Sequence, residues 1–353
     1  MRAILTALGT ANPQRYATQA EAYRVLETQF DLDPGERDLY RKLLLEGPID
    51  GRYVAVPRDE VLRSQDPDEL IARYLRHARD IAANAAGEAL VEASLEPSDV
   101  DALVVNTCTG YLCPGLSSYV AEDLSLRTST AVFDLAGMGC GAAIPNLECA
   151  TRMIQAGAKH TVLSVAVEIC SATFFRGPDP DLAVSNSIFG DGASAAVLQT
   201  PRSPTGPGFL KFLDFESAVL PKHREQLRYR HEGGRLRNVL SRKVPVIGAR
   251  AIGQATRCLL DRHNLDAHQI QWWAVHPGGT AVLERVEKTL NISHAALRFS
   301  YDVFRHYGNM SSPSVMFVLD KILREGTPES ADKGLLLSFG AGFTAFAALV
   351  EFC

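Results

Sequence analysis

A cysteine between two glycines is the residue of this chain whose setting most favours covalent chemistry. Residues 130–135 have the apolar pattern of a buried strand, and Gly139-Cys140-Gly141 follows before an amphipathic helix. A cysteine at the start of a helix faces free N–H groups and the positive end of the dipole, which stabilise a thiolate. The flanking glycines allow a tight turn and the close approach of a substrate. We therefore predict that Cys140 is a nucleophile that accepts an acyl group.

The same turn fits a second chemistry. Gly137, Gly139 and Ala142 have the spacing of the dinucleotide-binding pattern G-x-G-x-x-A. Glu168 ends the next predicted strand, where an acid could bind a ribose. The pattern describes many tight strand-to-helix turns and leaves Cys140 without a role. A dinucleotide-binding oxidoreductase is therefore the alternative outside acyl transfer.

Two residues of the second half could act on a carbonyl group. His276 ends a predicted strand before a glycine turn, and Asn309 precedes a predicted helix at 315–319. The N–H groups of an imidazole and an amide can both donate to a thioester oxygen as it becomes an enolate or a tetrahedral oxyanion. One reaction that such a site could catalyse is decarboxylative carbon–carbon bond formation. This reaction needs no Asp or Glu, because loss of CO2 generates the carbanion. We expect Cys140, His276 and Asn309 to form one site, without a metal or another cofactor.

An internal duplication explains how these distant residues could meet. Residues 95–106 and 265–276 share a helix end, a polar turn and a buried strand, at an offset of 170 residues. Residues 189–198 and 339–348 share a glycine-turn pattern. The first offset places Cys140 opposite Met310, next to Asn309. We predict two copies of one fold, residues 1–203 and 208–353, on either side of a Pro/Gly-rich stretch.

The predicted elements alternate helices and strands, which is the pattern of an α/β fold with buried strands. Asp66 and Pro67 predict the N-cap and first residue of a long helix. Strands are predicted at residues 3–8, 102–106, 130–135 and 161–167. The uncharged stretch 335–350 is interpreted as two strands joined at a glycine turn, because Gly340 and Gly342 interrupt it.

Composition narrows the class of protein. The chain has 353 residues, of which 46% are hydrophobic and 22% charged, with a net charge of −5. These values are typical of a soluble globular protein and argue against nucleic acid as a partner, since no block of Lys and Arg stands out. Seven cysteines without CxxC spacing indicate a reduced, cytoplasmic protein. The apolar N-terminal stretch is short for a signal peptide, and we expect no membrane insertion.

Together these motifs resemble the type III polyketide synthases, relatives of the plant chalcone and stilbene synthases in the thiolase-like superfamily. The matching segments are residues 9–13, 108–110, 139–141, 189–193, 276–279, 307–312 and 339–342. The resemblance implies a duplicated, layered αβαβα fold. It also implies an enzyme that loads an acyl-CoA starter on Cys140, extends it with malonyl-CoA by decarboxylative condensation, and cyclises it to a pyrone, a resorcinol or another aromatic polyketide.

The resemblance further implies roles for individual residues. His276 and Asn309 would bind the thioester oxygen, and Phe189 would be the gatekeeper between a CoA tunnel and the cavity. Cys113 would reach into the cavity of a neighbouring subunit, which implies a homodimer. The remaining substrate-binding candidates are Cys108, Thr109, Thr173, Asn238, Ser311, Gly340 and Gly342.

Some positions depart from the plant pattern. Asn238 replaces a bulky phenylalanine of the cavity wall, and Ala341 replaces a proline in the last glycine turn. Glu46 stands near the position of a CoA-binding lysine, so Arg41 and Lys42 are the candidates for that contact. The starter, the number of extensions and the product stay open. An acyl carrier protein is a second conceivable source of the starter.

The nearest alternative within the superfamily is a single-condensation β-ketoacyl synthase, which shares the Cys-His-Asn set. A biosynthetic thiolase is disfavoured, because Cys353 is at the terminus and no cysteine stands in the final glycine turn. A non-catalytic scaffold would be expected to lack one of the three residues, and all three are present.

Overall fold

A computed structural model of the chain describes residues 3–56, 66–177, 179–200 and 209–353. The helices are α1 (Gln19–Gln29), α2 (Pro34–Leu45), α3 (Pro67–Glu92), α4 (Leu116–Asp123), α5 (Ala143–Gln155), α6 (Pro180–Ile188), α7 (Val244–Arg262), α8 (Thr280–Leu290), α9 (Arg298–Tyr307) and α10 (Ser314–Lys321). The strands are β1 (Ile4–Ala11), β2 (Tyr16–Thr18), β3 (Gly51–Tyr53), β4 (Ala102–Thr107), β5 (Ala131–Ala136), β6 (Thr161–Ile169), β7 (Asp191–Gln199), β8 (Leu210–Val219), β9 (Leu227–Glu232), β10 (Arg235–Leu240), β11 (Trp272–Val275), β12 (Lys333–Gly340) and β13 (Thr344–Phe352).

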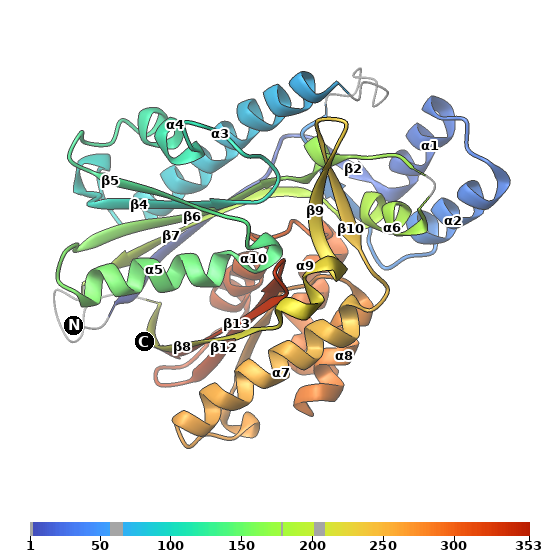
Figure 1. Cartoon of the computed structure of the whole chain (residues 1–353). Coiled ribbons are helices and arrows are strands. Elements are labelled where there is room, and N and C mark those ends of the chain that lie inside the picture. Colours follow the sequence, from blue (N-terminus) through green and yellow to red (C-terminus); the bar gives the residue numbers. More distant parts are fainter. Residues whose placement is uncertain (1–2, 57–65, 178, 201–208) are drawn as a thin grey trace.

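These elements form five layers (Figure 1). Helices α3 and α4 cover the outer face of strands β4 to β7, and α7 and α8 cover the outer face of β8, β12 and β13. Helices α5 and α10 lie between the two sets of strands. The buried residues of this middle layer come from both halves, for example Leu147 and Ile154 of α5 with Val315 and Phe317 of α10. The predicted αβαβα architecture is therefore confirmed.

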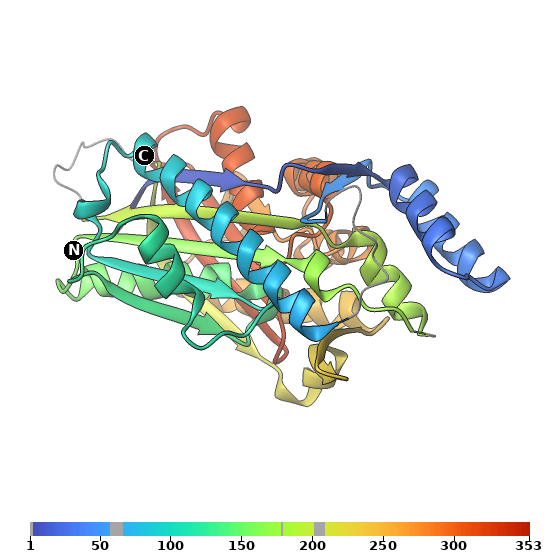
Figure 2. The same ribbon diagram turned by 90° about the horizontal axis from the view of Figure 1, so that it is seen from above.

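Nine of the described strands form one sheet in the order β11-β12-β13-β8-β1-β7-β6-β4-β5, while β9 pairs with β10 and β2 with β3 in two separate two-stranded sheets. Strands β1 and β8 pair antiparallel at the centre of the large sheet, through Ile4 with Lys211 and Leu5 with Leu210. On either side of this junction the order is the same, since β7, β6 and β4 correspond to β13, β12 and β11. Figure 2 shows α3 crossing the face of the first set, while α1 and α2 project at one end of the molecule.

The two segments that suggested a duplication adopt the same local structure. In each, a helix ends at a residue with left-handed backbone, Ser94 (φ 53°) or Asn264 (φ 51°). A short 3-10 turn with a capping box follows, at Pro97–Asp99 and at Ala267–Gln269, and then a buried strand begins. The Pro/Gly-rich stretch 201–208, which holds the predicted boundary, lies outside the described residues.

The halves differ where the offset of 170 residues predicts a counterpart of β5. Residues 301–306 belong to helix α9, so in the described chain the second half contributes four strands to the sheet. The other predicted strands and helices are present, but β5, which was predicted to be buried, is largely exposed because it lies at the edge of the sheet. Asp66 caps α3 by accepting from the N–H groups of Asp68 and Glu69, and β12 and β13 form the predicted strand pair. No helix in the described part of the chain is long and apolar enough to cross a membrane.

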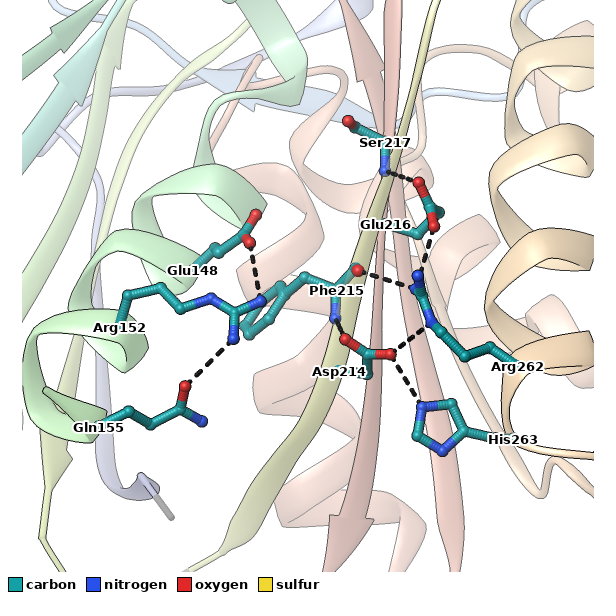
Figure 3. A network of polar contacts seen from close by, with 9 residues as sticks. All are labelled: Glu148, Arg152, Gln155, Asp214, Phe215, Glu216, Ser217, Arg262 and His263. Carbon is teal, nitrogen blue, oxygen red and sulfur yellow. Dashed lines mark hydrogen bonds and ion pairs between the residues drawn. The ribbon is translucent and has the colours of Figure 1, made fainter. Parts of the chain in front are cut away.

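A polar network ties the end of α7 to the central strand β8 (Figure 3). The Asp214 carboxylate accepts from Arg262 Nε at 2.8 Å and pairs with His263 Nε2 at 2.9 Å. Arg262 also contacts Glu216 at 3.0 Å. The network fixes α7 against the strand that joins the two halves, and α7 in turn supports the site described next.

Candidate active site

Cys140 lies in a sharp turn between β5 and α5. The turn is a 3-10 segment, Gly139–Gly141, in which Gly139 has left-handed backbone (φ 61°). Helix α5 begins at Ala143, so Pro145 falls in its first turn, where a proline is tolerated. We call the turn Gly139–Gly141 the first elbow. The turn between β12 and β13 packs directly on it. A Cβ atom on Gly340 would lie 2.0 Å from the Met138 carbonyl oxygen, so only glycine allows this approach.

The thiol of Cys140 is buried, and burial raises its pKa to about 12. A hydrogen bond from Ser311 Oγ to Cys140 Sγ, at 3.3 Å, acts in the opposite direction. Burial thus opposes the thiolate that the helix start was predicted to favour, while the Ser311 hydrogen bond favours it.

Asn309 has an amide whose orientation is fixed. Its Oδ1 accepts from the backbone N–H of Ser311 at 2.8 Å, so Nδ2 points away as a donor. The contact of Nδ2 with the Gly278 carbonyl is long, at 3.4 Å, and leaves donor capacity for a ligand. Because Gly278 belongs to the turn after β11, this contact joins Asn309 to the segment that carries His276.

His276 follows β11 and is almost fully buried, with 1% of its surface exposed. Burial lowers the pKa of His276 to about 3, so the ring is uncharged at neutral pH. Its Nδ1 atom has no hydrogen-bond partner among the described residues. The ring packs edge-on against Phe339, with 6.1 Å between ring centroids. A neutral imidazole offers one donor and one acceptor nitrogen to a substrate.

Ser311 and Asn309 lie in the turn after α9, which we call the second elbow. Ser311 connects this turn to the first elbow, which carries Cys140. It is buried and has left-handed backbone (φ 60°), a conformation that costs about 1–2 kcal/mol in a non-glycine residue. This backbone brings Ser311 Oγ within 3.3 Å of Cys140 Sγ, 3.4 Å of Cys108 Sγ and 3.4 Å of Glu168 Oε1. The resemblance implied a substrate-binding residue, and here the Ser311 hydroxyl touches the predicted nucleophile.

Glu168 is the site residue whose place the sequence analysis missed. Its carboxylate is buried beneath the elbows and accepts hydrogen bonds from the side chains of Thr107, Cys108, Thr109 and Ser312 and from the N–H groups of Cys108 and Thr109. Burial raises the pKa of Glu168, and these donors oppose the shift. Two features of the sequence could have indicated this place for Glu168. One is an acid at the end of a buried strand, and the other is the polar run 106–110.

The dinucleotide alternative is wrong in this structure. Glu168 is 0% exposed and its oxygens are engaged by protein donors, so it cannot bind a ribose. A Cβ atom on Gly139 would lie 2.9 Å from the backbone nitrogen of Ala341. The space above the turn is thus filled by the β12–β13 turn and is closed to a pyrophosphate.

Phe189 stands between Asn309 and a cavity. It forms a β-bridge with Asn309, and its neighbour Gly190 donates its N–H to the Asn309 carbonyl at 3.0 Å. On its other side Phe189 lines a cavity of about 110 Å³ together with Thr173 and Asn238. Asn238 Oδ1 accepts from Ser185 Oγ at 3.4 Å. These three predicted substrate-binding residues therefore lie around one space.

Four other predicted substrate-binding residues do not line the cavity beside Phe189. Thr109 Oγ1 donates to Glu168 at 2.8 Å, and Cys113 is an exposed thiol on the loop before α4. Arg41 and Lys42 lie exposed on α2, which packs against α1 and α6. Arg41 pairs with both Asp38 and Glu46, and Lys42 pairs with Asp38 at 2.8 Å.

Known families and proteins resemble this chain over nearly its whole length. The family described as "FAE1/Type III polyketide synthase-like protein" matches residues 10–208, and "Chalcone and stilbene synthases, C-terminal domain" matches residues 215–352. A 3,5-dihydroxyphenylacetyl-CoA synthase of Streptomyces toyocaensis is 31% identical, covering 88% of this chain and 82% of that protein.

Two further likenesses extend the match. An alpha-pyrone synthesis polyketide synthase-like protein of Mycobacterium tuberculosis is 28% identical, covering 97% of this chain and 89% of that protein. The crystal structure of PKS-I from the brown alga Ectocarpus siliculosus is 27% identical with a TM-score of 0.89, covering 100% of this chain and 98% of that chain. The fold is thus shared with this solved structure over the whole chain.

Proposed function

The chain belongs to the type III polyketide synthases, acyltransferases that build carbon chains by decarboxylative condensation, and from this premise we propose that Cys140, His276 and Asn309 are its catalytic residues. The observation that carries the proposal is the contact between the two elbows. Ser311, two residues after Asn309, donates to the sulfur of Cys140, although 171 positions separate them.

The first step is transfer of the starter to Cys140. The sulfur attacks the carbonyl carbon of an acyl-CoA, a tetrahedral oxyanion forms, and the bond to the CoA sulfur breaks. Burial opposes charge on both the thiol and the imidazole, so the proton leaves Cys140 for His276 as the carbonyl is attacked, not beforehand. His276 then returns this proton to the departing CoA thiolate, and the enzyme becomes acylated.

The second step is decarboxylation of malonyl-CoA beside the acyl-enzyme. Loss of CO2 leaves its electron pair in an enolate whose charge resides on the thioester oxygen. The Asn309 Nδ2–H and a ring N–H of uncharged His276 stabilise that oxygen. The enolate carbon attacks the acyl group on Cys140, the C–S bond breaks, and a chain longer by two carbons remains on CoA. Transfer back to Cys140 permits another extension.

The extended chain requires space, and we assign it to the cavity beyond Phe189. Its walls are mixed: Thr173 and Asn238 are polar, as are Arg15, Gln29, Arg52, Ser171, Ser185 and Asn186, and the other lining residues are apolar. Cyclisation there to a pyrone, a resorcinol or another aromatic product is consistent with this mixture. A single-condensation β-ketoacyl synthase would use the same three residues and is distinguished by the number of extensions.

Further proposals concern partners and organisation. CoA thioesters serve as substrates without another cofactor, and an acyl carrier protein is a second source of the starter. Residues 1–203 and 208–353 are the duplicated halves.

A homodimer would cover strand β5, an edge strand on which Val132 and Phe133 are 42% and 45% exposed. Asp134 of that strand accepts from the Ser117 N–H at 3.0 Å, so the nearby loop with Cys113 would also face the second subunit.

Product analysis tests the function. The enzyme is incubated with malonyl-CoA and a panel of short, aromatic and long-chain acyl-CoAs, and products are identified by mass spectrometry. We expect products with two or more malonyl-derived units from wild type and none from Cys140→Ala. Products limited to one unit would favour the β-ketoacyl synthase, and full output from Cys140→Ala would exclude the assignment of the nucleophile.

A further inference from the structure

Positive charge is concentrated in residues 222–243. This segment runs from the 3-10 turn η4 (Pro221–Gln226) through the β9–β10 hairpin to the residue before α7. It holds eight Lys and Arg against two Asp and Glu, whereas the whole chain holds 36 against 41. The expectation that no block of Lys and Arg stands out is therefore wrong here, because totals for the chain conceal a local excess.

Five of the eight cations are already engaged. Their contacts are Arg224 and Arg228 with Glu225, Arg230 and Arg237 with Glu232, and Arg235 stacked 4.2 Å from the centre of the Phe175 ring. These side chains hold the hairpin together and neutralise its two acids. Each of these five side chains is thus already held by a contact within the chain.

Lys222, Arg242 and Lys243 differ from the other five. All three are exposed, and none of their side chains has an ion-pair or hydrogen-bond partner among the described residues. The backbone holds them at one end of the hairpin, since the N–H of Ser241 donates to the Gln226 carbonyl at 2.9 Å. We call Lys222, Arg242 and Lys243 the unpaired cation cluster.

The chain segments that carry this cluster contact Phe339 and Phe343, the aromatic residues beside His276. The N–H of Leu220, just before η4, donates to the Phe343 carbonyl at 2.7 Å. Gly248, in the second turn of α7, lies against Phe339. A Cβ atom on Gly248 would be 2.9 Å from the Phe339 ring. The Phe339 and Phe343 rings stack at 5.4 Å, and Phe339 meets the edge of His276. The two segments that carry the cluster thus each contain a residue, Leu220 or Gly248, that contacts this aromatic pair.

The rim above the buried catalytic residues is built from glycine turns. Gly278 and Gly279 are partly exposed and Gly342 is exposed, whereas His276 and Asn309 are 1% and 3% exposed. A thioester must therefore extend its reactive end past this rim while the distal end of a long arm stays at the surface. In CoA that distal end carries the nucleotide phosphates.

We propose that the unpaired cation cluster binds the phosphate groups of the CoA thioester substrate while its acyl end lies at Cys140. This inference rests on the proposed function. It also moves the phosphate contact away from Arg41 and Lys42, the residues expected from the sequence. Asp38 and Glu46 already neutralise those two cations on α2, whereas nothing described neutralises the cluster.

The test compares a substrate with phosphates and one without. CO2 release is measured with malonyl-CoA and with malonyl-pantetheine, which has the same reactive end but no phosphate. In a variant with Lys222→Gln, Arg242→Gln and Lys243→Gln, we expect the KM for malonyl-CoA to rise about tenfold, equivalent to about 1.4 kcal/mol. The kcat for both substrates and the KM for malonyl-pantetheine should stay as in wild type.

The matched control is Arg41→Gln with Lys42→Gln, which removes two paired cations and should leave both KM values unchanged. Added salt should raise the wild-type KM for malonyl-CoA more than that of the triple variant, because screening acts on exposed charges. An unchanged KM in the triple variant, equal losses with both substrates, or a tenfold effect confined to the α2 control would each overturn the inference. Absence of turnover by wild type with either substrate would instead refute the proposed function.

Discussion

In the first half of the molecule the turn after β5 carries a thiol, whereas in the second half the corresponding turn after α9 carries an amide and a hydroxyl. Both turns contain a residue with nearly the same left-handed backbone, Gly139 at φ 61° and Ser311 at φ 60°. Both turns lead into a buried helix of the middle layer, α5 or α10. By the offset of 170 residues Ser311 corresponds to Gly141, so the left-handed residue stands two positions later in the second turn than in the first.

Met310, which the offset of 170 residues places opposite Cys140, points away from the elbow. Met310 is fully buried, and its sulfur accepts from Asn12 Nδ2 at 3.4 Å, away from the elbow. Its neighbour Ser311 turns toward Cys140. A shared fold therefore fixes where the two turns meet, but the local backbone decides which side chain of each turn enters the site.

The largest expected effect tests whether the halves could exchange roles. Cys140→Ala removes the atom that forms the acyl bond and should abolish product. Adding Met310→Cys to this variant should restore nothing, because that side chain points toward Asn12 and Gly192. Acyl-enzyme formation is followed by mass spectrometry of the intact protein, with circular dichroism to confirm folding. Acylation of the double variant would show that the halves are interchangeable.

The second effect concerns the donors of the second half. His276→Ala and Asn309→Ala should each lower kcat for malonyl-CoA decarboxylation by about 10²–10³-fold, because each removes one donor to the enolate oxygen. His268→Ala is the matched control, since this exposed histidine lies in the duplicated turn before β11. Loss of activity in the control, or decarboxylation at the wild-type rate in both site variants, would contradict the division of roles.

The third effect tests the contact between the elbow of the first half and the glycine turn of the second. Gly340→Ala should lower the free energy of unfolding by about 1–3 kcal/mol, because the added methyl group overlaps the Met138 carbonyl and the Gly141 nitrogen. Gly87→Ala, on α3, has open space and should be neutral or stabilising. Urea unfolding measures both. Equal stability of the two variants would show that the turns are not in close contact.

The smallest effect lies away from the site, in the polar network that ties α7 to β8 within the second half. Burial raises the pKa of Asp214, but the His263 hydrogen bond, the Phe215 N–H and Arg262 outweigh it, so its pKa is lowered. This stabilisation is therefore present above the ordinary pKa of about 3.9 and is lost as pH falls through the lowered value. Asp214→Asn should cost about 1 kcal/mol at pH 7, with little change in kcat.

Urea unfolding of wild type and Asp214→Asn at pH 7 and near the acid limit of folding measures this difference. The two proteins should converge at low pH. Arg152→Ala, which breaks the exposed Glu148–Arg152 pair on α5, is the control and should cost less than about 0.5 kcal/mol (Figure 3). A difference between wild type and Asp214→Asn that persists at low pH would assign the effect to packing.

Local patterns in the sequence predicted much of this architecture. Asp66 and Pro67 marked the start of α3, and Gly340 and Gly342 marked the turn between β12 and β13, because caps and turns depend on a few neighbouring residues. The glycine-flanked Cys140 could be selected for the same reason. The absence of a strand at 301–306 could not be predicted, since the offset alone does not determine whether a repeated segment keeps its structure.

The sequence by itself determined the family, the candidate triad and the idea that two similar halves face one another, because these rest on residue types and spacing. Only the tertiary structure decided what surrounds them. It placed Glu168 beneath the elbows, joined Ser311 to Cys140, and separated the paired cations of α2 from the unpaired cation cluster. The physical reason is that burial and electrostatic neutralisation depend on which distant segments pack together, and no local pattern records that.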